Sequence, residues 1–151
     1  MHRTYTNEEI TLFWNSEKCR HAKMCVTGCP KVFEFGRRPW VILENGENPE
    51  IWKAVQKCPS GALTAVYNYG VWISYDKEGC RSVATAGDRE IGVCEYREEE
   101  GEFQIFRTKV DPDYENKGIG RRLVYRVLEE AERQKKRVSA TCPYAAGILQ
   151  E

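Results

Sequence analysis

Four of the seven cysteines lie in the first half of the chain, where three sit close together and the fourth directly precedes a proline. They are Cys19, Cys25, Cys29 and Cys58. Thiolates are soft ligands, and a loop of cysteines followed by a distant Cys-Pro favours an iron–sulfur cluster. Zinc is one alternative, although it favours closely spaced ligand pairs and the first two cysteines are too far apart for one pair. A set of ordinary buried thiols is the other alternative.

Two glycines, Gly118 and Gly120, form a second candidate site between a strand and a long amphipathic helix. Glycine lets the backbone approach a ligand closely, and the first turn of a helix presents its N–H groups to phosphate. A lone Gly-x-Gly is a weak signal, however, and a plain tight turn is the alternative.

The elements that must position the cysteines are short. We expect a strand over 9–15, the cysteine loop over 16–30, a helix over 49–57 and a returning strand over 62–67. The helix is expected to bury Ile51, Trp52 and Val55, and to end at Cys58-Pro59.

Asn68-Tyr69-Gly70 is the expected boundary between two domains, 1–69 and 70–151. Beyond it the pattern predicts a meander of strands over 71–75, 81–86, 90–97 and 103–110. A helix over 117–136 and a last strand over 138–142 follow. Cys80 and Cys94 are expected to lie in strands, and nothing in the sequence gives them a role.

Composition narrows the class of protein. The 23 basic and 23 acidic residues cancel, which argues against a nucleic-acid partner. Apolar runs are too short to span a bilayer, so no membrane partner is expected, and the polar N-terminus lacks a secretion signal. We therefore expect a cytoplasmic protein, in which cysteines serve metal ligation or catalysis more often than disulfides.

The first 68 residues resemble the divergent 4Fe–4S mono-cluster family. The resemblance rests on Cys19-Arg20-His21-Ala22-Lys23-Met24-Cys25, on Pro30-Lys31-Val32-Phe33 and Arg38-Pro39-Trp40, and on Cys58-Pro59-Ser60-Gly61-Ala62-Leu63. It implies a small ferredoxin-like α+β domain in which Cys19, Cys25 and Cys58 are cluster ligands.

The same resemblance leaves the fourth ligand open. The second ligand of ordinary mono-cluster ferredoxins would fall at Ala22, which cannot bind iron. His21 fits the family's Cys-x-His pattern, and imidazole ligates iron in other mixed clusters. His21 is therefore the favoured fourth ligand, with Cys29 or a solvent-open iron as the alternatives.

Residues 71–151 resemble the small GNAT-like N-acetyltransferases that carry a Cys-Pro-Tyr or Cys-Pro-Phe motif. The resemblance rests on Thr108-Lys109-Val110, Lys117-Gly118-Ile119-Gly120, Leu123-Val124 and Thr141-Cys142-Pro143-Tyr144. It implies a minimal mixed α/β domain and hence an α+β protein. It also implies that Gly118, Ile119, Gly120 and Arg121 bind the pyrophosphate of acetyl-CoA, and that the strand ending at Val110 binds the pantetheine arm.

Two departures and two mechanisms accompany this second resemblance. Glu115 replaces the usual Arg or Gln, placing negative charge near a diphosphate, and Asn116 replaces a glycine.

In one mechanism the amine attacks acetyl-CoA directly while Tyr144 protonates the departing thiolate; in the other Cys142 first accepts the acetyl group. A buried structural thiol is the alternative for Cys142.

The sequence thus predicts an iron–sulfur protein fused to an acetyl-CoA-dependent N-acetyltransferase, with the cluster in a redox, sensing or structural role. The alternative is a non-catalytic CoA-binding and electron-transfer protein. A redox partner protein and an amine substrate are the expected partners.

Overall fold

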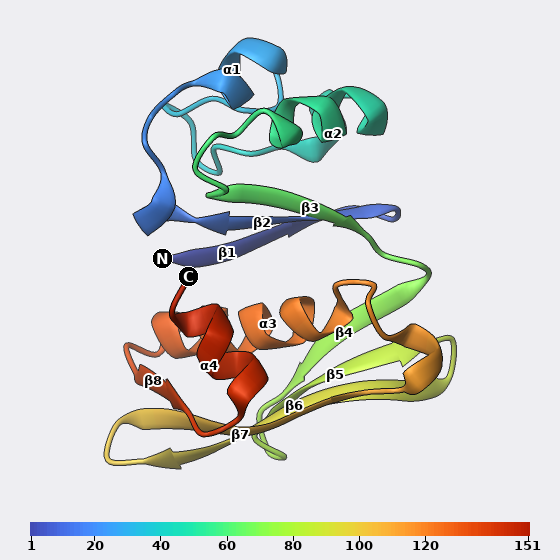
Figure 1. The fold of residues 1–151 in the computed structure, drawn as a ribbon, viewed down its shortest axis with the longest axis vertical. Coiled ribbons are helices and arrows are strands. Elements are labelled where there is room, and N and C mark those ends of the chain that lie inside the picture. Colours follow the sequence, from blue (N-terminus) through green and yellow to red (C-terminus); the bar gives the residue numbers. More distant parts are fainter. The chain divides into compact units, whose positions relative to one another are not determined.

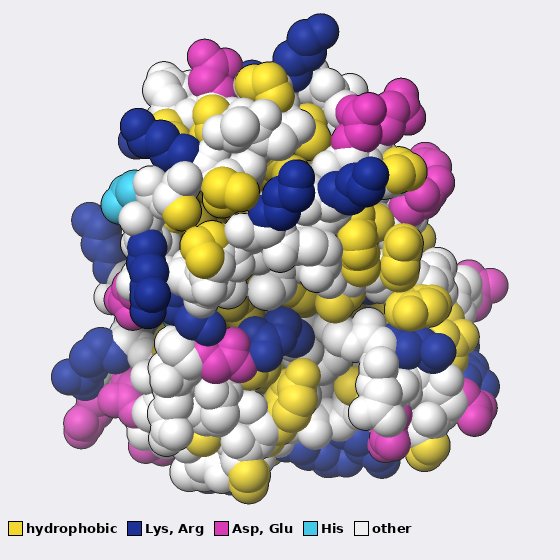
Figure 2. Space-filling view, turned by 45° about the horizontal axis from the view of Figure 1, so that its top comes forward, with side chains coloured by type: hydrophobic (Ala, Val, Ile, Leu, Met, Phe, Trp, Pro, Cys, Tyr) yellow, Lys and Arg dark blue, Asp and Glu magenta, His cyan; other side chains and the backbone are white.

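The computed structural model describes residues 1–151 and divides into two compact units, Met1–Tyr67 and Asn68–Glu151. The expected boundary at residue 69 lies two residues from this division. Helices and sheets occur in both units, which confirms the α+β class. None of the helices is both long and apolar enough to cross a bilayer. On the face shown in Figure 2, side chains of both charge signs are interspersed.

The first unit is built on an antiparallel sheet of three strands in the order β1-β2-β3. The strands are His2–Thr6, Ile10–Asn15 and Leu63–Tyr67. The central strand β2 is buried along its whole length, and its alternate residues Ile10, Leu12 and Trp14 belong to the apolar core of the unit. Asn7 shapes the β1–β2 turn, since its Oδ1 accepts the N–H groups of Glu9 and Ile10, both at 2.9 Å.

Two helices, α1 (Met24–Gly28) and α2 (Asn48–Gln56), cover one face of this sheet (Figure 1). They approach closely where Gly28 faces Ala54, because a Cβ at Gly28 would lie 2.9 Å from the Ala54 Cβ. Of the residues expected on the inner face of α2, Ile51 and Val55 are buried in the core. Trp52 packs against the core but is only partly buried, and it stacks on Tyr67 at 4.5 Å. Ala54, which was not expected there, is buried.

The second unit is a five-stranded sheet in the order β4-β5-β6-β7-β8, antiparallel except for the parallel β7–β8 pair. The strands are Val71–Asp76, Arg81–Ala86, Arg89–Glu99, Glu102–Val110 and Arg137–Ala140. Helices α3 (Ile119–Arg133) and α4 (Pro143–Leu149) lie on one face (Figure 1). The α3 helix provides the crossover that a parallel β7–β8 pair requires.

Two buried polar side chains fix α3 on this sheet. The hydroxyl of Ser82 on β5 donates to the Leu123 carbonyl at 2.7 Å. The Arg122 guanidinium is 4% exposed and donates to the carbonyls of Asn68 at 3.4 Å and Val71 at 2.9 Å. It thereby holds the start of β4 against the helix. The acceptors of this buried cation are backbone carbonyl groups and not a carboxylate.

Four features differ from the sequence expectation, and the first is helix α1, which lies within the expected cysteine loop over 16–30. The prediction that Cys80 lies in a strand was wrong, because Cys80 ends the β4–β5 turn with φ 54. Strand β1 was not predicted, since its polar residues are only partly buried at a sheet edge. Helix α4 was not predicted either; its Pro143 occupies the first helical turn, where a missing N–H is tolerated.

Candidate functional site

Three cysteines of the first unit surround one small hollow. Cys19 follows a short 3₁₀ helix (Ser16–Lys18), Cys25 lies in α1, and Cys58 follows the end of α2. All three line the hollow, together with the loop residues His21 and Ala22. Its remaining wall is partly apolar and includes Trp14, Met24, Phe35 and Leu63. The three thiols predicted as ligands are therefore brought together.

The thiols also interact electrostatically. Burial raises the pKa of the Cys25 thiol, and negative charge on Cys58 or Cys19 raises it further. Burial acts in the same direction on Cys58, but hydrogen bonds from the Leu63 N–H and the Ser60 hydroxyl outweigh it, so the pKa of Cys58 is lowered. The Ser60 Oγ lies 3.7 Å from the Cys58 Sγ. Three converging thiolates repel one another, and a cationic metal core removes that repulsion.

The structure separates Cys29 from the other three cysteines. Cys29 is 7% exposed and belongs to the apolar core of its unit. It lines a different hollow with Gly46 and Glu50, and burial followed by the Glu50 charge raises its pKa. The sequence could not show this separation, because Cys29 follows α1 directly and its backbone leaves the helical path at φ −139.

His21 lies on the side of the loop that lines the hollow. Its backbone N–H donates to the Cys19 Sγ at 3.4 Å, and its φ is 55, in the left-handed region. Its imidazole meets Phe35 edge-on at 6.4 Å, and Phe35 in turn stacks on Trp40 at 5.1 Å. His21 and Ala22 thus line the same hollow as the three thiols.

The donor set fits an iron–sulfur cluster better than a single ion. No group of three His, Cys, Asp or Glu side chains, including the three thiols of this hollow, is arranged to hold a single metal ion. A cluster does not require such convergence, because each of its irons takes a different protein ligand. The three partly buried thiols around this hollow could supply three such ligands, and a cluster of four irons would need one more.

The second candidate site lies where β7 and β8 separate. Their parallel pairing ends at Ile105↔Ala140, whereas β7 continues to Val110. The N–H groups of Thr141 and Cys142 both turn to the Ile105 carbonyl, at 2.9 and 3.3 Å. The β6–β7 pair has a bulge next to Ile105, where Phe106 is the extra residue on β7. The far end of β7 is therefore left without β8 on this side.

A hollow of about 310 Å³ lies beside this free end of β7. It is lined by Thr108, Val110, Tyr114, Glu115, Asn116, Gly118, Ile119, Gly120 and Tyr144. The first turn of a helix leaves its N–H groups without acceptors inside the helix, and here that turn begins at Ile119. Predicted binding residues from the strand, the glycine turn and the Cys-Pro-Tyr segment thus surround one hollow.

Tyr144 packs across the glycine turn. A Cβ at Gly120 would lie 3.0 Å from three atoms of the Tyr144 phenol, so glycine allows this contact without displacing the ring. The Arg121 side chain does not face the hollow as a free cation, because it forms two hydrogen bonds to Glu151 at 2.6 and 2.7 Å. Any contact from Arg121 to a diphosphate is therefore left to its backbone.

Cys142 is 8% exposed and lies next to this hollow, because it contacts Thr108, which lines the hollow. Its Sγ donates to the Thr108 Oγ1 at 3.5 Å. Burial raises the pKa of Cys142, but hydrogen bonds from the Ala145 N–H, the Thr108 hydroxyl and the Tyr144 N–H outweigh it, so the pKa is lowered. Burial raises the pKa of Tyr144, so its phenol stays protonated at neutral pH. The second unit itself contains no histidine that could act as a base.

Sequence reasoning missed the role of Thr108, which was noted only as part of a motif. The available signal was strand alternation, since Thr108 and Val110 share one face of β7 and both line the hollow. It also missed the partner of Arg121, because the Glu151 contact joins residues far apart in the sequence.

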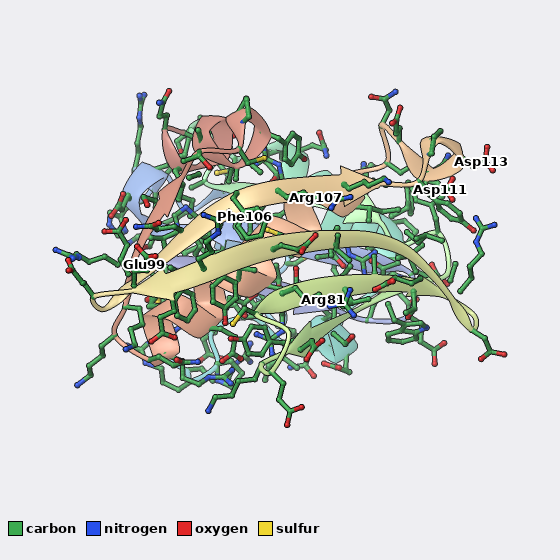
Figure 3. The ribbon with its side chains drawn as sticks, turned by 90° about the horizontal axis from the view of Figure 1, so that it is seen from below. Arg81, Glu99, Phe106, Arg107, Asp111 and Asp113 are labelled. Atoms are coloured by element: carbon green, nitrogen blue, oxygen red, sulfur yellow. The ribbon has the colours of Figure 1, made fainter.

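The opposite face of the β4–β8 sheet has a different character. Figure 3 shows this face, with Arg81 and Arg107 on its strands and Asp111 at the end of β7. Its charges are paired: Arg81 contacts Glu90 at 2.8 Å, and Arg107 contacts Glu95 at 3.7 Å. The hollow on this face contains none of the predicted site residues, so we assign no chemistry to it.

Comparison with known proteins follows the same division. Residues 5–68 match the sequence model of the divergent 4Fe-4S mono-cluster family, and residues 81–151 match that of the GCN5-related N-acetyl-transferase family. The uncharacterized protein YjdI of Escherichia coli K12 is 37% identical over 62 residues, which are 41% of this chain and 82% of YjdI. YjdI of Escherichia coli O157:H7 matches to the same extent.

Through its first unit the chain belongs to the divergent 4Fe-4S mono-cluster family, and its second unit is a GCN5-related, acetyltransferase-like domain. Among solved structures, a GCN5-related N-acetyltransferase from Sphaerobacter thermophilus aligns with 91% of this chain at 19% identity and a TM-score of 0.42. The chain spans 36% of that protein's length.

Proposed function

We propose that this protein combines a 4Fe–4S cluster with an acetyl-CoA-dependent N-acetyltransferase. The observation that carries the enzymatic part is the separation of β7 and β8 next to Cys142, beside a hollow that the glycine turn also lines. An extended pantetheine arm can pair with the free edge of β7 near Val110. The diphosphate then meets the N–H groups of Ile119 and Gly120 at the start of α3.

The cluster would be held by Cys19, Cys25, Cys58 and His21. When bound, it supplies one-electron redox chemistry to a partner protein, a redox signal, or structural support for a small domain. The three thiolates hold the core, and the N–H groups and hydroxyl around Cys58 stabilise its charge. Trp14 and Phe35 restrict water on one side.

All seven cysteines are free thiols in the structure. Free thiols and an iron–sulfur cluster suit a reducing compartment, and this supports the proposal that the protein works in the cytoplasm.

Two routes of acetyl transfer fit the geometry. In the covalent route, the Cys142 thiolate attacks the thioester carbonyl; a new S–C bond forms, and the S–C bond to CoA breaks. The amine then attacks the acetyl-cysteine, a C–N bond forms, the amine releases a proton and the Cys142 thiolate leaves. In the direct route, the amine attacks acetyl-CoA itself and Tyr144 gives its phenolic proton to the departing CoA thiolate. The lowered pKa of Cys142 favours the covalent route.

Incubation of the purified, cluster-loaded protein with labelled acetyl-CoA separates these routes. We expect label on Cys142 in the wild type and none in Cys142→Ala. The variant Cys80→Ala is the control, because it removes another thiol of the same unit that lies in the β4–β5 turn, outside the site. Binding of acetyl-CoA without label, together with turnover of an amine, would instead support the direct route. Absence of both binding and turnover would overturn the enzymatic proposal.

One observation favours a second function, a CoA-binding electron-transfer protein without catalysis. The exposed carboxylate of Glu115 lines the hollow where the diphosphate is expected. Acetyl-CoA binding that reaches saturation, with no turnover of any amine tested and no label on Cys142, would favour this function.

Spectra of variants test the cluster ligands. We expect His21→Ala to change the absorption and electron paramagnetic resonance spectra of the reduced cluster, because imidazole and thiolate differ as donors. Unchanged spectra in His21→Ala would remove His21 from the ligand set and favour an open iron beside Ala22.

A further inference from the structure

One hydroxyl lies between two thiols beneath the second site. The Thr108 Oγ1 is 3.5 Å from the Cys142 Sγ and 3.7 Å from the Cys94 Sγ. The β6–β7 register places Cys94 directly opposite Thr108, and the chain brings in Cys142 immediately after β8. Cys94 is fully buried, so this group of three is closed to solvent on the Cys94 side.

When both cysteines are thiols, the two hydrogen bonds of this group point in the same direction, from Cys142 towards Cys94. Cys142 donates to Thr108, and the Thr108 hydroxyl donates to the Cys94 Sγ. A hydroxyl offers one donor and can accept as well, so rotation about its C–O bond can reverse the chain. If Cys142 loses its proton, the Thr108 hydroxyl can donate to the thiolate while the Cys94 S–H donates back to Thr108.

The reversal requires Cys94 to keep its proton. Burial raises the pKa of Cys94 to about 12, and the hydrogen bond from Thr108 only partly offsets this effect. Cys94 therefore stays a neutral donor at any pH at which Cys142 ionises. The two thiols differ in environment, and this difference fixes which of them becomes the thiolate.

We propose that Thr108 is a positioning residue for the Cys142 thiolate, which it stabilises by reversing a Cys142–Thr108–Cys94 hydrogen-bond chain. The Cys142 proton leaves to solvent, and the other two protons only change their acceptors. The link to acetyl transfer rests on the proposed function, whereas the thiolate itself can be measured without acetyl-CoA.

The other ionisable groups near Cys142 do not replace Thr108. Tyr144 from α4 interacts electrostatically with both Cys142 and Cys94, but its raised pKa keeps it neutral. Arg121 from α3 acts on Tyr144, and its charge is balanced by Glu151. The neutral donors to the thiolate are therefore the Thr108 hydroxyl and the N–H groups of Ala145 and Tyr144.

The test is the rate of Cys142 alkylation by iodoacetamide as a function of pH, measured on the full-length, cluster-loaded protein. Trypsin cleaves after Arg137, so the peptide over 138–151 reports Cys142 separately from the other six cysteines. Thr108→Val keeps the side-chain shape and removes the hydroxyl. Since a hydrogen bond to a charged group is one of the stronger kind, we expect the midpoint of the pH profile to rise by about one unit, and alkylation at neutral pH to slow about tenfold.

Two further variants separate positioning from packing. Thr108→Ser restores a hydroxyl and should return the profile to that of the wild type. Cys94→Ala removes the donor behind Thr108 and should shift the midpoint upward by a smaller amount. The proposal is overturned if Thr108→Val leaves the midpoint unchanged, or if Thr108→Val and Thr108→Ser shift it equally. Absence of acetyl label together with the expected alkylation shifts would reject the acyl-transfer route and leave the Thr108 assignment standing.

Discussion

The contact between Gly120 and Tyr144 gives a quantitative prediction about the second site. A Cβ at Gly120 would lie 3.0 Å from the Tyr144 Cε1, Cζ and hydroxyl oxygen, closer than ordinary van der Waals contact. Tyr144 is 47% exposed, so its ring can move aside. We estimate the displacement at about 1 kcal/mol, comparable to the strain of a side chain pushed off its rotamer.

The same substitution also has a favourable effect. Alanine is better than glycine within a helix by about 0.5–1 kcal/mol, and Gly120 lies in the first turn of α3. In the wild-type background the two effects nearly cancel, so Gly120→Ala should change stability little. In the Tyr144→Ala background only the favourable effect remains, and Gly120→Ala should stabilise the unit by about 0.5–1 kcal/mol. The expected coupling between the two positions is therefore about 1 kcal/mol.

Amide hydrogen exchange of α3 is the suitable assay, because the two units need not unfold together. Exchange of the buried residues Leu123 and Val127 reports the opening free energy of the second unit alone. Four proteins complete the cycle: the wild type, each single variant and the double variant. Equal effects of Gly120→Ala in both backgrounds would refute the packing of Tyr144 over the glycine turn, and with it the proposed position of Tyr144 beside the thioester.

Three further predictions concern charges. Glu115→Gln removes an exposed carboxylate that lines the hollow where the diphosphate is expected, so CoA should bind about two- to fivefold tighter at low salt. Calorimetric titration should show this gain in affinity at low salt and its loss at high salt. Burial lowers the pKa of Arg122 to about 10, equivalent to roughly 3 kcal/mol of lost hydration. The opening free energy from α3 exchange should therefore lie within about 1 kcal/mol of the wild type in Arg122→Met, which fills the space, and should fall by about 2–4 kcal/mol in Arg122→Ala. Equal losses in the two variants would contradict this reasoning. Hydrogen bonds from the Gly79 N–H and Arg81 lower the pKa of Asp76. Its stabilising effect is therefore present above pH 3.8 and is lost as the pH falls through the lowered pKa. In Asp76→Asn the melting temperature should fall less steeply over this acidic range than in the wild type.

The regular elements of the fold could largely be predicted from hydrophobic periodicity. The meander, the long helix and the final strand of the second unit were expected within a few residues of their positions, because each has a clear apolar face. Strand β1 gave no such signal, since His2–Thr6 is polar and is stabilised by pairing with β2. Helix α4 gave none either, because its short apolar segment is stabilised by packing on α3 and β8.

The candidate sites could be predicted in part. Residue type and spacing identified Cys19, Cys25 and Cys58, which line one hollow. Spacing could not show that Cys29 lies on another side of α1, because this depends on how the chain leaves the helix. The Thr108 bridge was equally hidden, since it depends on the register that places Cys94 opposite Thr108.

Iron and acid-labile sulfide analysis of the anaerobically purified protein tests the central claim, a cluster held by three specific thiolates, most directly. Four irons and four sulfides per chain are expected in the wild type and in Cys29→Ala, because Cys29 lies outside the hollow. Cys58→Ala, which removes one of the three converging thiols, should lose most of both. Zinc without sulfide in the wild type, or loss of the cluster in Cys29→Ala with retention in Cys58→Ala, would contradict the account.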